Sequence, residues 1–301
     1  MTSRAEAPGY RHDMNAASDG GVVLCGVDQS RHAAAAAALA GRFAALLQLQ
    51  LVLLHAADPP LVPLHLGDSQ ERLLTQTSFD HAGTLRTVVE PISIDDPVQV
   101  TRMVEFGSPA EVVRTAASEL RAELAVVGSR GQSPVEDLWI GSTSSALAQE
   151  APCPVVLTRA GSSGSPTSLP GQVIVCGVDG SEPSVAAARS SARLAERLGV
   201  PLLLAHVARE HEEGPVETAA AAARTEAPSV DVEIAQVRGP ITEMLIALAR
   251  EREAGLIAVG SRGRGSIKAA LLGSVSRSLI QAADRPVLVV SPGVGEASAV
   301  T

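Results

Sequence analysis

Short, continuous runs of apolar residues alternate along this chain with longer helix-forming segments. Most runs lack polar alternation, which is typical of strands buried on both faces of a parallel sheet. In the first half, the expected strands are 22–27, 51–56, 98–104, 124–127 and 155–157. The segments between them predict helices at about 31–47, 68–81, 108–121 and 142–149. Ser108 and Glu111 frame a proline, a pattern that predicts a capping box.

The second half of the chain repeats the first. Val173–Asp179 matches Val22–Asp28 at an offset of 151 residues, and His206 matches His55 at the same offset. From the third strand onward the offset falls to 132, so the second copy is shorter between its second and third strands. This internal repetition predicts two copies of one structural unit.

Each copy reads as five strands alternating with helices. This order predicts an α/β fold in which two doubly wound, Rossmann-like, five-stranded parallel sheets follow one another. A stretch rich in Gly, Ser and Pro between the copies reads as a linker. The expected organisation is a flexible leader, a first domain, a linker, a second domain and a tail, at residues 1–20, 21–159, 160–171, 172–292 and 293–301.

A glycine motif follows the fourth strand in each half. It reads Gly-x2-Gly-x9-Gly-Ser, from Gly128 to Ser142 and again from Gly260 to Ser274. Glycines let a backbone come close to a ligand, and the free N–H groups of a helix start attract anions. Ligands of doubly wound sheets bind beyond the carboxyl ends of the strands. The motif therefore predicts a polyphosphate site in each half, although a plain turn followed by a helix cap is the alternative.

Better-known phosphate motifs do not occur in this sequence. A Walker loop needs Gly-Lys-Ser/Thr, and Lys268 is the only lysine. A dinucleotide fingerprint would follow the first strand, where the sequence from Gly26 to Arg31 lacks the required glycines. An adenylating enzyme of this fold would carry a Ser-Gly-Gly-x-Asp-Ser loop at the same place. The glycines of this chain follow the fourth strand instead.

Acidic and basic residues near the motif have competing interpretations. Asp28 and Asp179 follow the first strand of each half, where they either cap the next helix or contact a ligand base, ribose or metal. Arg130 and Arg262, inside the motif, are either phosphate ligands or surface charges. The residues alone leave both choices open.

Composition narrows the classes of partner and the compartment. The net charge is −9, acidic residues outnumber basic ones in both halves, and aromatic residues make up 2%, which argues against nucleic acid as a partner. No apolar run is long enough to cross a membrane. Three cysteines without a secretory signal indicate the cytoplasm, and Cys25 and Cys176 lie in apolar runs as core residues. His55 and His206 lack ligand-spaced partners, which favours a structural role.

Both halves resemble the universal stress protein domain, over about residues 21–159 and 171–292. The resemblance is carried by the two first-strand aspartates, the two strand-end histidines, Gly107 and Gly239, both complete glycine motifs, and the closing Pro154-Val155 and Pro286-Val287. The glycine motif is similar to that of the family's ATP-binding branch. The resemblance implies that each half is an adenine nucleotide alpha hydrolase-like domain with an ATP site, where Mg²⁺ would enter alongside the phosphates near Asp28 or Asp179.

Site residues follow from the resemblance by position in the motif. The aspartates would approach the adenosine, and Ala56, Val127, Val207 and Val259 would line or flank the adenine pockets. Ribose and phosphates would be held by Gly128, Arg130, Gly131, Gly141, Ser142, Thr143 and Ser144 in the first half, and by Gly260, Arg262, Gly263, Gly273, Ser274, Val275 and Ser276 in the second.

Two departures distinguish the halves. Gln29 replaces the glycine found at 180, which would tighten the first entrance, and Gln132 stands opposite Arg264, which removes a positive charge. Both departures favour the second site.

The function implied is an ATP-binding regulator of the stress response, acting through nucleotide-dependent conformation or partner binding rather than as a dedicated enzyme. Family members pair through the fifth strand, so Val155–Leu157 and Val287–Val290 would form a pseudo-twofold contact within the chain, and two chains would form a homodimer. A slow ATP hydrolase and a nucleotide-independent scaffold are the alternatives. A cradle of N–H groups also tolerates AMP or a cyclic nucleotide.

Overall fold

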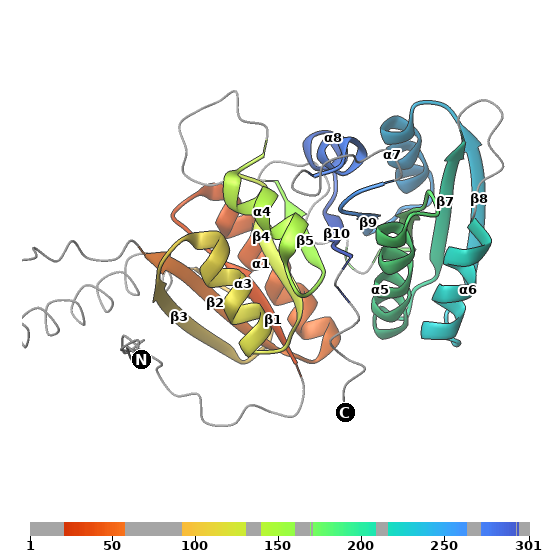
Figure 1. Ribbon diagram of the computed structural model, residues 1–301. Coiled ribbons are helices and arrows are strands. Elements are labelled where there is room, and N and C mark those ends of the chain that lie inside the picture. The colour runs from red at the N-terminus through yellow and green to blue at the C-terminus, as the bar shows by residue number, and fades with distance from the viewer. Residues whose placement is uncertain are drawn as a thin grey trace, which may run out of the picture.

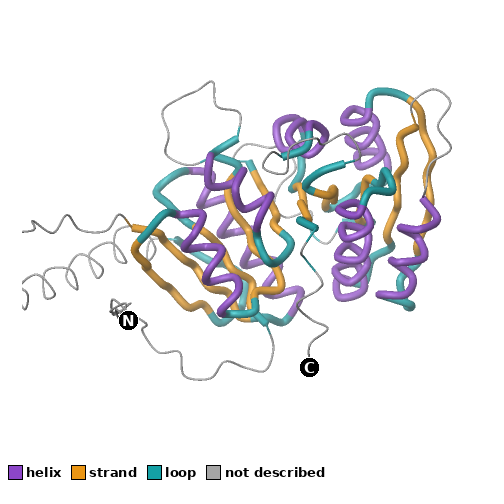
Figure 2. The backbone as a smooth tube through the Cα atoms, viewed as in Figure 1, coloured by secondary structure: helices purple, strands orange, loops and turns teal. Residues whose placement is uncertain are grey.

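The computed structural model describes residues 21–57, 92–130, 140–159, 169, 171–208, 216–263, 272–292 and 294. Strands and helices alternate through these ranges in the predicted order (Figures 1 and 2). The helix expected at 68–81 lies outside the described residues, as do Gly131 and Gln132 of the first glycine motif.

Each half contributes five strands and the helices that connect them. The first half comprises β1 (Val22–Gly26), α1 (Arg31–Leu47), β2 (Gln50–Ala57), β3 (Val100–Phe106), α3 (Pro109–Glu119), β4 (Ala122–Gly128), α4 (Ser142–Glu150) and β5 (Val155–Thr158). The second half comprises β6 (Ile174–Gly177), α5 (Glu182–Leu198), β7 (Leu202–Ala208), α6 (Val216–Glu226), β8 (Val232–Arg238), α7 (Ile241–Glu251), β9 (Leu256–Gly260), α8 (Ser274–Ala282) and β10 (Val287–Val290).

The two parallel sheets merge into one ten-stranded sheet. Its order is β3-β2-β1-β4-β5-β10-β9-β6-β7-β8, so the second half runs in the reverse order of the first. Strands are parallel within each half, and β5 pairs with β10 antiparallel. At the centre of that pair Val156 faces Leu288, its own counterpart at the 132-residue offset. The fifth strands therefore meet about a pseudo-twofold axis, as the family resemblance implies (Figure 1).

Helices cover both faces of the sheet and enclose two apolar cores. Residues of α1, α5 and α6 form one core, and those of α3, α4, α7 and α8 form the other. Alternate strand residues point to opposite faces, so Cys25 belongs to the first core and Leu24 to the second. Cys25 and Cys176 are fully buried, which confirms their predicted place in the core. Each core contains residues of both halves and helps to hold them together.

Polar contacts reinforce the junction between the halves. Ser291, which follows β10, donates a hydrogen bond of 2.8 Å to the Ala151 carbonyl at the end of α4. Arg159, at the equivalent position after β5, donates to the Gln281 carbonyl near the end of α8. Each half therefore holds the carboxyl end of the other half's glycine-motif helix.

The capping box predicted at α3 is not formed. Ser108 is the N-cap residue and Pro109 begins the helix, but the Ser108 side chain makes no capping hydrogen bond. Proline at the first helical position lacks an N–H group, so this helix start depends less on a side-chain cap. Among the described helices of the first half, α1 receives a serine cap, because Ser30 Oγ accepts a 3.1 Å hydrogen bond from Ala33 N.

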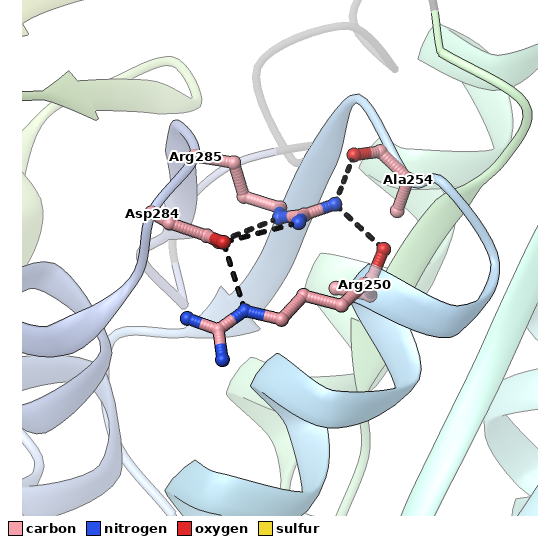
Figure 3. A network of polar contacts seen from close by, with 5 residues as sticks. Arg250, Ala254, Asp284 and Arg285 are labelled. Carbon is pink, nitrogen blue, oxygen red and sulfur yellow. Dashed lines mark hydrogen bonds and ion pairs between the residues drawn. The ribbon is translucent and has the colours of Figure 1, made fainter. Parts of the chain in front are cut away.

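A polar network braces the strand β10 in the second half (Figure 3). Arg285 donates to the Asp284 carboxylate and to the carbonyls of Ala249 and Ala254, and Arg250 donates to Asp284 at 2.8 Å. Partial burial acts to raise the pKa of Asp284, but the hydrogen bonds from Arg285 and Arg250 outweigh it and lower the pKa to about 2. The network fixes the end of α7 against the start of β10.

Candidate nucleotide site

The glycine motif closes a loop at the end of each fourth strand. After β4, Ser129 N donates to Thr158 O at 2.8 Å, and Ser129 O accepts from Gly141 N at 2.9 Å. The second half repeats this arrangement at Ser261, whose carbonyl accepts from Gly273 N at 2.8 Å. The chain thus leaves the strand and returns to the same point. The closing hydrogen bond occurs at the same motif position in both halves.

The second serine after each closing glycine braces the loop. Ser144 Oγ donates to Gly128 O, and Ser276 Oγ donates to Gly260 O, both at 2.7 Å. Both serines are almost fully buried, at 4% and 3% exposure. The sequence predicts that these serines help to hold the phosphates. In the structure, both hydroxyls donate their hydrogen bonds to the loop backbone instead. They therefore fix the glycine turn against the helix.

Helices α4 and α8 start at the closed loop with free donor groups. Their N-caps are Gly141 and Gly273, and neither helix receives a side-chain cap. The side chains of Ser142 and Ser274, which follow, are exposed. The first-turn N–H groups of a helix have no intrahelical partner and carry a partial positive charge. These two helix starts can therefore bind an anion.

Asp28 and Asp179 organise the turn between the first strand and its helix. Asp28 Oδ1 accepts from Ser30 N at 2.9 Å, and Asp179 Oδ1 accepts from Ser181 N at 3.0 Å and Ser181 Oγ at 2.6 Å. The N-cap residues of α1 and α5 are Ser30 and Ser181. The helix-capping alternative for the aspartates is therefore wrong. Each aspartate instead stabilises the turn that links its strand to the following helix.

The glycine loop and the aspartate turn meet beyond the carboxyl ends of the strands. A methyl group at position 263 would lie 2.5 Å from Asp179 Oδ2. A methyl group at position 260 would lie 2.6 Å from the Pro183 carbonyl carbon, and one at position 128 would lie 2.8 Å from His32 Cβ. Only glycine permits such close approach. The glycine loop and the aspartate turn therefore converge in the second half.

The strand-end histidines have a structural role. His55 Nδ1 lies 2.8 Å from Val27 O, and His206 Nδ1 lies 2.9 Å from Val178 O. Because a carbonyl only accepts, Nδ1 carries the hydrogen in both rings. Each histidine therefore ties the end of the second strand to the end of the first, and it directly precedes Ala56 or Val207 in the chain.

The other predicted site residues that the structure describes lie at the same edge of the sheet. Val127 and Val259 are buried at the ends of β4 and β9. Half-buried residues after these strands and in the first turns of the following helices are Arg130, Thr143, Arg262 and Val275. The site is thus apolar toward the strands and polar toward the loops.

Sequence reasoning missed three basic residues at the first site. Arg31 and His32 begin α1, and Arg159 follows β5. Burial lowers the pKa of His32, and the positive charges of Arg31, Arg130 and Arg159 lower it further, while Asp28 acts in the opposite direction. Comparison of the two halves could have identified these three basic residues, because the second half has Glu182, Pro183 and Ser291 at the corresponding positions.

The described residues contain neither a metal-binding cluster nor a membrane-spanning helix. No group of three or more His, Cys, Asp or Glu side chains there could hold a metal ion. Among the same residues, no helix is both long and apolar enough to cross a membrane.

Comparison with known proteins identifies the family. The profile of the universal stress protein family matches residues 21–159 and 171–291, so the chain belongs to this family and carries two of its domains in tandem. A universal stress protein of Mycolicibacterium smegmatis is 28% identical over 287 residues, covering 90% of this chain and 97% of that protein. One from Mycobacterium tuberculosis is 30% identical over 299 residues, covering 89% of this chain and 95% of that protein.

The fold has a counterpart among solved structures. A universal stress protein from Archaeoglobus fulgidus superposes with a TM-score of 0.63 at 20% identity, covering 90% of this chain and 98% of that one. At this identity the likeness concerns the fold, which is the tandem Rossmann-like arrangement described above.

Proposed function

We propose that each domain of this universal stress protein binds ATP and that the chain acts in the stress response through nucleotide-dependent conformation or partner binding. The observation that carries the proposal is the meeting of Gly263 with Asp179 beyond the strand ends. It brings a glycine loop, an uncapped helix start and a carboxylate together. Family membership supports the same conclusion.

Each part of the site matches one part of the nucleotide. The uncapped N–H groups of α4 and α8 would receive the phosphates, with Arg130 and Arg262 adding positive charge. The buried valines at the ends of β4 and β9 would contact the adenine. The aspartates would approach the ribose. This division explains why the site is apolar toward the strands and polar toward the loops.

Mg²⁺ would enter with the phosphates. The described residues form no metal-binding cluster of their own, so the ion would take most of its ligands from the phosphates and water, with Asp28 or Asp179 beside it. When bound, it would neutralise phosphate charge.

The proposal also includes the cellular compartment and the oligomeric state of the protein. We infer a cytoplasmic protein, because the three cysteines are free and buried and the chain is acidic. A homodimer of tandem chains would bring four domains together. Light scattering of the purified protein tests the dimer directly.

The site assignment is tested by calorimetric titration of nucleotide-free protein with Mg-ATP. The wild-type chain is expected to bind two equivalents. Asp28→Ala and Asp179→Ala are each expected to bind one, and the double variant none. Asp231→Ala, which removes an exposed acid before β8, serves as the control and is expected to bind two. Two equivalents on the double variant would contradict the proposed sites, and phosphate release during the titration would favour slow hydrolysis.

A further inference from the structure

His32 lies in the wall of the first nucleotide site. It is the second residue of α1 and is 9% exposed. A methyl group at position 128 would lie 2.8 Å from its Cβ and 3.0 Å from its carbonyl carbon, so the glycine that opens the motif packs directly on this residue. His32 is therefore held against the first glycine of the motif, at the start of the loop that would receive phosphates.

The sheet topology surrounds this histidine with charge. The strands β1, β4 and β5 are adjacent, and their carboxyl ends lead to Asp28 and Arg31, to Arg130, and to Arg159 respectively. Arg31, Arg130 and Arg159 oppose protonation of His32, and Asp28 favours it. Burial and the start of a helix oppose protonation as well. In the unliganded site, burial and these positive charges therefore lower the pKa of His32.

A bound polyphosphate reverses this balance. Its negative charge would lie among the three arginines and offset the repulsion that they exert on an imidazolium. Binding of the anion and binding of a proton to the histidine would then favour each other, and by linkage each raises the affinity for the other by the same factor.

The second site provides an internal comparison. At the positions of Arg31, His32 and Arg159 the second domain has Glu182, Pro183 and Ser291. Pro183 packs on Gly260 as His32 packs on Gly128, so the backbone arrangement is kept while the titratable ring is absent.

We propose that polyphosphate binding at the first site, and only there, is coupled to uptake of a proton from solvent by His32, so that the affinity of this site rises as the pH falls. The inference rests on the proposed nucleotide function and adds a regulatory difference between the two sites. It makes the first domain responsive to acidification, whereas the second domain binds independently of this residue.

The experiment is calorimetry of Mg-ATP binding in two buffers of different ionisation enthalpy, between about pH 8 and pH 5.5. Asp179→Ala isolates the first site, and His32→Gln is introduced into the same background. The terminal phosphate of ATP titrates near neutrality itself, so the difference between the two proteins is the quantity of interest. We expect extra proton uptake and a gain on the order of tenfold in relative affinity across this range with histidine present.

Two further variants define the outcome. Arg159→Ser copies the second domain and removes one opposing charge, so it is expected to move the rise in affinity to higher pH. Asp28→Ala isolates the second site, where His32→Gln is expected to change nothing. Equal proton uptake by the first site with and without His32 would overturn the inference while leaving ATP binding intact. Absence of ATP binding by the wild-type chain would overturn the proposed function as well.

Discussion

Gly263 faces the carboxylate of Asp179 so closely that a methyl group at position 263 would lie 2.5 Å from Oδ2. Asp179 is already held by two hydrogen bonds from Ser181, so it has little freedom to move aside. Gly263→Ala is therefore expected to displace the loop and to weaken nucleotide binding at the second site by about tenfold or more, which corresponds to roughly 1.4 kcal/mol. Calorimetry in the Asp28→Ala background measures this directly.

The matched control for that variant is Gly199→Gln. Gly199 has a positive φ of 68°, no atom within 4 Å of an added methyl group, and a counterpart, Gln48, that adopts φ of 56° in the first domain. The substitution is expected to leave nucleotide binding unchanged. An equal loss of affinity in both variants would show that the Gly263 effect is not local.

Loss of the serine brace is expected to destabilise the second domain. Ser276→Ala removes the 2.7 Å hydrogen bond to the Gly260 carbonyl in a buried setting, which is expected to cost about 1–2 kcal/mol in the free energy of unfolding. Urea denaturation followed by circular dichroism measures it. Ser274→Ala, at an exposed position in the same helix turn, is the control, with an expected change within about 0.5 kcal/mol. Equal stabilities would remove the structural role assigned to Ser276.

The Asp284 network is expected to make the second domain sensitive to acid. The pKa of Asp284 in the folded chain, about 2, lies below its ordinary value of 3.8, so its stabilisation is complete above about pH 4 and is lost as the pH falls toward 2. Asp284→Asn is expected to be less stable than wild type by on the order of 1 kcal/mol at pH 5, with the difference shrinking at lower pH.

Urea denaturation at several pH values tests this expectation. Glu233→Gln, in the exposed pair between Arg252 and Glu233, is the control, and its stability is expected to stay within about 0.5 kcal/mol of wild type throughout. A difference for Asp284→Asn that stays constant with pH would contradict the assigned pKa.

The three cysteines are expected to be unreactive in the folded protein. Burial raises the pKa of the Cys153 and Cys176 thiols to about 12 and raises that of Cys25 still further. The thiolate is the reactive form, so labelling with a thiol reagent at neutral pH is expected to be negligible without denaturant. In urea, all three should label. Fast labelling of the native chain would contradict the packing of the strands.

Much of the fold could be predicted because the same sequence pattern occurs in both halves of the chain. The run at 124–127 is continuous and apolar, and the structure places β4 at Ala122–Gly128. The glycine motif has the same spacing in both copies, and a hydrogen bond joins its two ends at Gly141 and again at Gly273. Features that the backbone requires leave such marks in a sequence.

Features that depend on three-dimensional convergence were harder to predict. The sequence predicts that Ser144 helps to hold the phosphates. Its sequence position gives no sign that its hydroxyl donates to the Gly128 carbonyl instead. His32 falls in an alanine-rich helical segment, and its chemistry arises only where the ends of β1, β4 and β5 meet. Comparison with Pro183 in the second copy was the one available signal.

The nucleotide content of purified, undialysed protein tests the central claim most directly. The protein is denatured, and the released nucleotides are separated and quantified by chromatography against the protein concentration. The account predicts about two ATP molecules per chain, one for each glycine motif. No released nucleotide, together with no binding of added Mg-ATP by calorimetry, would contradict it.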